Sequence, residues 1–163
     1  MRRLLLLLLW LTTLVGGVRA GEVEPLPTAH GGVQLEAQGL DGKTVSLREG
    51  RGRVTVLVFW SPESMASRKS MGELQRFADM ADAREVFFLA ISTTGTAESI
   101  AAFARARGLT LPLALRQADD LGTLPEQGLP LALLFDQEGR LRQRRVGLIR
   151  LRALLEPVRE LLK

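Results

Sequence analysis

The stretch from Val54 to Leu74 constrains the fold most, because it predicts a buried strand that runs directly into a helix. Residues 54–60 (VTVLVFW) form a nearly continuous apolar run, rich in β-branched and aromatic side chains, that is typical of a strand covered on both faces. Pro62 ends this strand, and Ser64 offers a helix N-cap. Beyond it, apolar residues recur at helical spacing: Met71, Leu74, Phe77, Ala78 and Ala81. The helix therefore lays one apolar stripe on a sheet, and the strand–helix junction is where we expect a functional site.

The first 20 residues have the pattern of a secretory signal peptide. A charged start, Met1 to Arg3, precedes an apolar run from Leu4 to Val15, and small residues lead to Ala20. The apolar run is too short to span a bilayer comfortably. We expect cleavage near Ala20 and a periplasmic or secreted protein. The alternative is an uncleaved membrane anchor, because Arg19 is unusual so close to a cleavage site.

The remaining chain predicts a flexible arm over residues 21–32 and one domain over residues 33–163. The arm is rich in Gly, Pro and acidic residues and shows no periodicity. It contains His30, the only histidine of the protein, which has no other ligand-type residue at metal-binding spacing. We therefore expect neither a metal site nor a cofactor.

Charge and cysteine usage exclude two classes of function. Of 22 basic residues, Arg2, Arg3 and Arg19 lie in the signal, which leaves 19 basic residues against 18 acidic ones in the rest of the chain. This balance does not favour a nucleic-acid partner. The chain has no cysteine, so it has neither a disulfide nor a thiolate nucleophile, although it carries an export signal.

The order of the expected elements is strand, helix, strand, helix, hairpin, helix. Two short strands, Val33–Leu35 and Thr44–Leu47, are joined by an Asp-Gly turn. After the central strand and helix, the expected elements are, in chain order, a strand over Glu85–Ser92, a helix capped by Thr96 and ended by Gly108, an extended segment over Leu111–Leu115, a brief helix capped by Asp119 and Asp120 before Pro125, strands over Leu131–Phe135 and Arg140–Val146, and a helix over Ile149–Lys163. Pro157 should kink the last helix or delay its start.

Residues Phe59 to Leu74 (FWSPESMASRKSMGEL) resemble the redox-motif turn of the thioredoxin superfamily, in particular the TlpA-like and ResA-like (redoxin) periplasmic thiol-disulfide oxidoreductases. That family has Phe-Trp, a few small residues, a C-x-x-C motif and then a helix. Ser64 and Ser67 stand at the two cysteine positions. The frame of the motif is present, but its reactive sulfur atoms are not.

The resemblance implies an α/β thioredoxin-like fold, with a central mixed sheet, helices on both faces and an N-terminal β-hairpin. It extends over residues 33–163. Gly128-Leu129-Pro130, followed by an apolar strand, resembles the cis-proline loop of the family, so the Leu129–Pro130 bond is expected to be cis.

The resemblance also implies a binding groove for an extended segment of another protein at the start of the helix. Its residues would be Trp60, Pro62, Met65, Leu129 and Pro130. The alternative is that these residues are simply core and turn residues. Ser64 is expected to cap the helix rather than act as a nucleophile, since no histidine is at hand to serve as its base. We assign no catalytic residue.

Arg140, Arg142 and Arg144 alternate along the predicted edge strand and are expected to share one of its faces. Such charge commonly prevents edge-to-edge pairing. A docking patch for an acidic partner or an anionic lipid is the alternative.

Taken together, the residues and the resemblance predict a periplasmic thioredoxin-like protein that has lost its redox dithiol. We expect it to bind an envelope protein or extended peptide, close to envelope thiol homeostasis or cytochrome c maturation, rather than to catalyse redox exchange. A structural subunit that docks through the arginine-rich strand is the alternative. A cysteine-free enzyme is less favoured, because the sequence has neither a second histidine nor a metal-ligand cluster.

Overall fold

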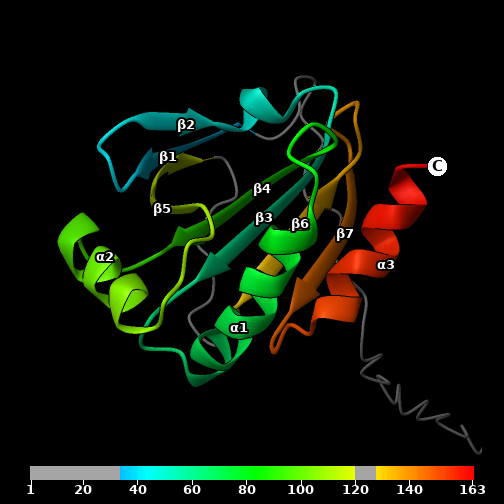
Figure 1. The fold of residues 1–163 in the computed structure, drawn as a ribbon. Coiled ribbons are helices and arrows are strands. Elements are labelled where there is room, and N and C mark those ends of the chain that lie inside the picture. The colour runs from blue at the N-terminus through cyan, green and yellow to red at the C-terminus, as the bar shows by residue number, and fades with distance from the viewer. Residues whose placement is uncertain (1–33, 120–127) are drawn as a thin grey trace, which may run out of the picture.

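The computed structural model describes residues 34–119 and 128–163, which form a seven-stranded mixed sheet with three α-helices and a short 3-10 helix (Figure 1). The elements are β1 (Leu35–Gly39), β2 (Thr44–Ser46), η1 (Leu47–Gly50), β3 (Val54–Trp60), α1 (Met65–Met80), β4 (Val86–Ser92), α2 (Ala97–Ala106), β5 (Leu113–Asp119), β6 (Leu131–Phe135), β7 (Leu141–Val146) and α3 (Leu151–Leu161). The strand order is β2-β1-β5-β4-β3-β6-β7. The predicted signal, arm and short helix before Pro125 lie outside the described residues.

The predicted elements agree with the structure except at two strands. β1 begins at Leu35, where the predicted strand ended. β5 extends to Asp119, beyond the predicted end of the extended segment at Leu115. Pairing explains both differences, because β1 lies between β2 and β5 and β5 pairs with both β1 and β4. A strand with two partners can extend beyond its own apolar run.

β3 is the centre of the sheet and is buried on both faces, as its sequence predicted. Its side chains alternate between two apolar clusters. Val56, Val58 and Trp60 face one cluster, while Leu57 and Phe59 face the other. The N-cap of α1, Ser64, thus lies shortly after the end of a strand that is paired on both edges and buried on both faces.

All three α-helices contribute to the same face of the sheet, whereas the sequence predicted helices on both faces. Leu74 of α1, Ile100 of α2 and Leu154 of α3 all join the cluster of Val56 and Val58. The connections β3-α1-β4 and β4-α2-β5 both join neighbouring parallel strands in one direction along the sheet. Right-handed crossovers in one direction place both helices on one side. α3 then packs beside α1 (Figure 1).

Pro157 lies inside α3, which begins at Leu151. The proline therefore does not delay the start of the helix. Leu154 and Val158, on either side of it, are buried in the core cluster. Tertiary packing on these residues offsets the backbone hydrogen bond that proline cannot make.

Ser70 joins α1 to the residues just before α3. Its hydroxyl donates to the Ala66 carbonyl oxygen (2.8 Å) and accepts from the Ile149 amide (3.0 Å). Ser70 and Ile149 are both fully buried. The substitution Ser70→Ala leaves the Ile149 N–H without this acceptor, so we expect the free energy of unfolding to fall by about 1–3 kcal/mol. Urea denaturation of this variant, beside Lys69→Ala on the exposed face of α1, measures the effect; equal stabilities would contradict the prediction.

Candidate binding site at the start of α1

Ser64 is the N-cap of α1, as the sequence predicted. Its Oγ accepts a hydrogen bond from the Ser67 amide at 3.2 Å and donates one to the Leu129 carbonyl oxygen at 3.2 Å. The first bond satisfies a helix amide that has no intrahelical partner. The second ties the helix start to the loop before β6. One hydroxyl thus joins two segments that lie 65 residues apart in the chain.

Ser67 is fully buried one turn into the helix. Its Oγ accepts a hydrogen bond from the Ser61 amide at 3.3 Å. The two serines at the predicted cysteine positions therefore lie together, and both have structural hydrogen bonds. The hydroxyl of Ser64 donates to a backbone carbonyl, which cannot take up its proton as a general base must. The contacts of both hydroxyls are those of structural residues.

A small polar network beside Ser64 was not predicted from the sequence. The Ser61 hydroxyl donates to a Glu63 carboxylate oxygen, and the Thr94 hydroxyl donates to the same oxygen at 2.5 Å. These bonds, from Ser61 first and Thr94 second, lower the pKa of Glu63 and keep it ionised. Arg68 donates to the backbone carbonyls of Pro62 and Glu63 and so holds the turn. The pairing of Ser61 with Glu63 two residues later could have suggested a local turn, but Thr94 becomes a neighbour only in the folded chain.

The Leu129–Pro130 peptide bond, for which the resemblance implies the cis form, is cis in the structure. Leu129 is 7% exposed, and Pro130 is buried. The carbonyl oxygens of both residues already accept hydrogen bonds, from Ser64 Oγ at 3.2 Å and from the Gly147 amide at 2.9 Å. The loop is thus held between the start of α1 and the end of β7.

The structure changes the composition of the predicted groove. Trp60 is fully buried, with its ring 5.2 Å from that of Phe103, so it cannot line a surface groove. The reason is the alternation along β3, which turns Trp60 toward the helix-covered face. Leu129 and Pro130 are also buried, and Pro62 is half-buried. Met65, at 60% exposure, is the predicted residue with a large surface.

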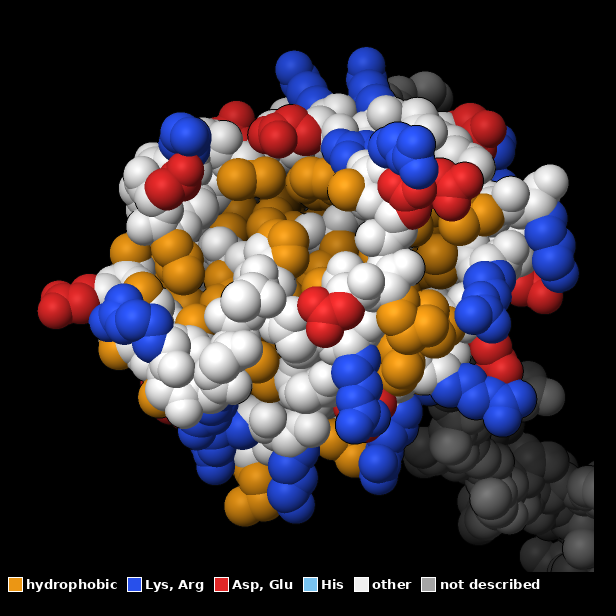
Figure 2. All heavy atoms as spheres, viewed as in Figure 1, with side chains coloured by type: hydrophobic (Ala, Val, Ile, Leu, Met, Phe, Trp, Pro, Cys, Tyr) orange, Lys and Arg blue, Asp and Glu red, His pale blue; other side chains and the backbone are white. Residues whose placement is uncertain are grey.

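Two further apolar side chains are exposed beside the cis bond. Val146, 51% exposed, pairs with Leu131, and Leu148, 43% exposed, follows the Gly147 that bonds Pro130. Met65 follows Ser64, which bonds Leu129, and we call the three exposed residues around this loop the cis-proline patch: Met65, Val146 and Leu148. The sequence signal for Val146 and Leu148, two apolar residues directly after an arginine-rich strand, was overlooked. Figure 2 shows that apolar side chains reach the surface on the face of α1 and α3 between basic and acidic ones.

Arg140 and Arg142 both form ion pairs with the buried carboxylate of Asp136. Both donate from Nε to the same oxygen of Asp136, at 3.0 and 2.7 Å, and Arg140 also pairs with Glu138 at 3.0 Å. Their charge is therefore largely neutralised within the protein.

The simple alternation that predicted one face for Arg140, Arg142 and Arg144 does not hold along β7. The register of β6 and β7 shifts between Leu134 and Phe135, so that Leu141 lies opposite Phe135 and Arg144 opposite Leu133. One extra residue in a strand reverses the faces beyond it. Arg144 and Arg145 each have a buried Nε without a hydrogen-bond partner among the described residues.

Neither a cluster of metal ligands nor a membrane-spanning helix is found in the part of the chain that the structure describes. No group of three or more His, Cys, Asp or Glu side chains could hold a metal ion in residues 34–119 and 128–163. Within those same ranges, no helix has both the length and the apolar character that crossing a membrane requires.

The fold resembles those of solved thiol-disulfide proteins. An exposed lipoprotein thioredoxin from Streptococcus pneumoniae has 22% identity, with 78% of this chain and 98% of that chain covered and a TM-score of 0.63. A secreted thiol-disulfide isomerase from Corynebacterium glutamicum has 17% identity, with 79% and 83% covered and a TM-score of 0.69. A thioredoxin-family thiol:disulfide interchange protein from Chlorobium tepidum has 15% identity, with 81% and 95% covered and a TM-score of 0.67. A comparison with curated proteins finds no match.

These structures show that the protein has a thioredoxin-like fold. The sequence model of the AhpC/TSA family matches residues 31–144, which is more than half of the chain. The protein therefore belongs to the AhpC/TSA family. It does so without any cysteine, and serines occupy the two positions of the C-x-x-C motif.

Proposed function

We propose that this protein acts outside the cytoplasm as a binding member of its family, which recognises an extended segment of another envelope protein and performs no thiol–disulfide exchange. The observation that carries the proposal is the state of Ser64 and Ser67. They occupy the start of α1 beside the cis-proline loop, and their hydroxyls make structural hydrogen bonds. Exchange proceeds through attack of a thiolate on a disulfide, and a serine hydroxyl does not replace it.

The location and the cellular process are parts of the same proposal. The signal-like first 20 residues support export, with cleavage near Ala20 or retention as an anchor as the two alternatives. Relatives in fold are named as a secreted isomerase and an exposed lipoprotein. Envelope thiol homeostasis or cytochrome c maturation is the process in which such a binding protein would act.

The cis-proline patch is the surface that we assign to the partner. Its three side chains are exposed apolar residues that adjoin, along the chain or across β6 and β7, a loop that two hydrogen bonds hold in place. The carbonyls of Leu129 and Pro130 each already accept a bond, so recognition rests more on side-chain contacts than on added strand pairing. Met65 is flexible and polarizable and tolerates varied partner side chains. A small surface of this kind supports affinities in the micromolar range or weaker.

A structural subunit that docks through β7 is the second candidate. Arg140 and Arg142 are neutralised by Asp136 and Glu138, which leaves Arg144 and Arg145 as the arginines of this strand without an ion pair among the described residues. Their two charges could bind an acidic partner, with an affinity that falls as salt is added. A cysteine-free enzyme is not favoured, since Ser64 lacks a base among its hydrogen-bond partners.

We expect the purified protein to show no disulfide reductase activity. The physical reason is the absence of any thiol in the chain, because each step of exchange needs a thiolate. Insulin reduction by dithiothreitol, followed by turbidity with and without the protein, measures this. Turnover that exceeds the protein-free blank and rises with protein concentration would contradict the proposal.

Partner binding should be lost on Met65→Asp and retained on Met80→Asp. Both methionines are on α1 with similar exposure, 60% and 55%, but Met80 lies at the opposite end of the helix. A charge on the patch disrupts apolar contact, whereas the same charge at Met80 does not. The measurement is recovery of partner proteins from envelope extract by immobilised wild type and each variant, at low and high salt.

A third variant separates the two candidates. Arg144→Glu with Arg145→Glu should leave the partners bound if the cis-proline patch holds them. If this variant loses them while Met65→Asp keeps them, the docking-subunit alternative replaces the patch. Binding that falls steeply with salt would point the same way.

A further inference from the structure

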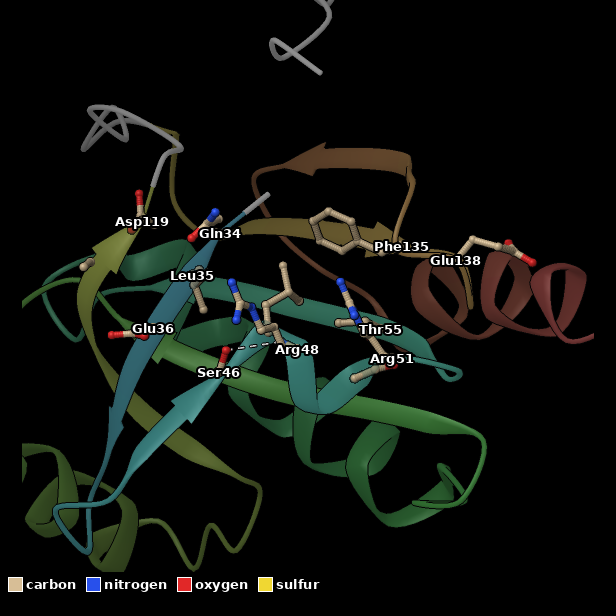
Figure 3. Close-up of a pocket in the computed structure, with 14 residues that line it drawn as sticks. Gln34, Leu35, Glu36, Ser46, Arg48, Arg51, Thr55, Asp119, Phe135 and Glu138 are labelled. Carbon is tan, nitrogen blue, oxygen red and sulfur yellow. Dashed lines mark hydrogen bonds between the residues drawn. The ribbon is translucent and has the colours of Figure 1, made fainter. Parts of the chain in front are cut away.

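A cavity of about 670 Å³ lies at the end of β3 opposite to the candidate site (Figure 3). Its lining includes Thr55 near the start of β3, whereas the candidate site follows Trp60 at the end. Five residues of extended strand separate the two positions by about 17 Å. The walls come from β1, β2, η1, β3, the end of β5 and the turn between β6 and β7. The volume is within the usual range for small-ligand sites, roughly 300–1,000 Å³.

Two arginine side chains line this cavity without a partner of their own. Arg48 belongs to η1, and Arg51 follows it. In Figure 3 both rise from η1 into the space that Leu35 and Phe135 border. Neither guanidinium has a hydrogen bond or ion pair within residues 34–119 and 128–163. Both arginines are exposed residues of the cavity wall, and among the described residues neither guanidinium is paired.

The acidic residues of the lining do not neutralise these arginines. Asp119 accepts bonds from Arg116 at 2.5 and 2.7 Å, and Glu138 pairs with Arg140 at 3.0 Å. The side chain of Glu36 points away from the two arginines in Figure 3. None of the lining carboxylates of Glu36, Asp119 and Glu138 thus forms an ion pair with Arg48 or Arg51 in the described residues.

The segment that carries the two arginines is held from several directions. Ser46 and Glu49 form a capping box around η1. Arg53 donates to the Glu49 carbonyl oxygen at 2.5 Å, and the Gly52 amide donates to the Gln137 carbonyl oxygen at 3.1 Å. Gly50 lies against Thr55, where a Cβ would collide with the threonine hydroxyl. These contacts fix the backbone from which both arginine side chains extend.

We propose that this cavity binds a small organic anion whose phosphate or carboxylate group lies between the guanidinium groups of Arg48 and Arg51. The planar fork of a guanidinium matches both oxyanions and forms charge-assisted hydrogen bonds with them. Leu47, a half-buried wall residue, offers contact to the organic part of the ligand. The site is independent of the missing dithiol and of the cis-proline patch.

Calorimetric titration of the purified protein with phenyl phosphate, benzoate and phenol tests this assignment. The three probes share a ring and differ in charge. We expect binding of phenyl phosphate and of benzoate, none of phenol, and weaker binding as salt is added. Vesicles of phosphatidylglycerol form a separate arm, because a lipid headgroup carries the same phosphate chemistry. Vesicle binding that needs both arginines, without binding of the soluble probes, would support the anion site and assign its ligand to a headgroup.

The variants Arg48→Gln and Arg51→Gln should each raise the Kd for phenyl phosphate at least about tenfold, as loss of a charge-assisted bond predicts. The double variant Arg105→Gln with Arg150→Gln removes two exposed arginines far from the cavity lining and should leave the Kd unchanged. Circular dichroism shows that each variant is folded. The assignment fails if no probe and no vesicle binds at millimolar ligand, or if Arg48→Gln with Arg51→Gln binds as tightly as the wild type.

Discussion

The double substitution Ser64→Cys with Ser67→Cys is expected to produce a redox-active C-x-x-C protein from one that has no thiol. Both positions lie at the start of α1, and the Ser67 amide already donates to the side-chain oxygen of Ser64. A thiolate at Ser64 would receive the same donor and the positive end of the helix dipole, which lower the pKa of a thiol from its usual value near 8.5. The buried position of Ser67 suits a second thiol that resolves a mixed disulfide.

Thiol titration and insulin reduction measure this gain. The reduced double variant should show two titratable thiols, lose both after mild oxidation, and accelerate insulin reduction. Ser64→Cys alone is the matched control: it has the attacking thiol without the resolving one, so mixed disulfides should accumulate on it. If the two introduced thiols do not pair after oxidation, the alignment of Ser64 and Ser67 with the family motif is wrong.

The second large effect is expected at Asp136, the buried carboxylate between β6 and β7. It is 4% exposed and accepts bonds from the Arg140 amide at 2.8 Å and from Nε of Arg140 and Arg142 at 3.0 and 2.7 Å. Burial alone would raise the pKa of Asp136, but the hydrogen bonds from Arg140 and Arg142 outweigh it and lower the pKa from 3.8 to about 2. The ionised form is thus favoured in the folded protein.

A carboxylate whose pKa is lower in the folded state stabilises the protein above its unfolded pKa. The contribution of Asp136 is therefore complete above about pH 4 and is lost as the pH falls through 2. The shift corresponds to at most about 2 kcal/mol, because solvent around the half-exposed arginines screens the pair. Asp136→Asn should lower the free energy of unfolding at pH 7 by about 2–4 kcal/mol, since it also leaves two guanidinium groups without their acceptor.

Asp82→Asn is the control for this prediction. The pKa of Asp82 is also lowered to about 2, chiefly by the side-chain hydrogen bond from Arg84, but that pair lies on the surface. Denaturation from pH 7 to pH 2 should show a flatter pH dependence for Asp136→Asn and little change for Asp82→Asn. If both variants lost the same free energy of unfolding at pH 7, the burial of Asp136 would not be the cause of its effect on stability.

Local patterns determined the central part of the fold. The run from Val54 to Trp60 predicts β3 to the residue, and Ser64 predicts the N-cap of α1, because β-branched runs and capping side chains act over a few residues. The mixed thioredoxin-like sheet was implied by the resemblance of Phe59 to Leu74 to the thioredoxin superfamily. The pairing of β1 with β5 did not follow from such local patterns, because its hydrogen bonds join residues about 80 positions apart.

The surfaces were decided by the tertiary structure. Trp60 was expected in a groove, but the strand alternation and the position of α2 place it in the core against Phe103. Val146 and Leu148 became part of the patch because Gly147 bonds Pro130. The solvent exposure of a side chain depends on which helices and strands pack over it. The residues next to it in the sequence do not determine that packing.

The sequence by itself determined that the chain has no cysteine, and hence that it lacks dithiol chemistry, together with the strand–helix junction that belongs to its family. The tertiary structure alone decided that all three helices contribute to one face, that Asp136 neutralises two of the predicted docking arginines, and that Arg48 and Arg51 line one cavity. The physical reason is the separation along the chain over which each kind of interaction acts. The absence of cysteine is a property of the sequence itself, and a helix cap depends on a few neighbouring residues. The ion pairs of Asp136, the cavity and the placement of the helices on one face of the sheet arise from contacts between elements that only folding brings together.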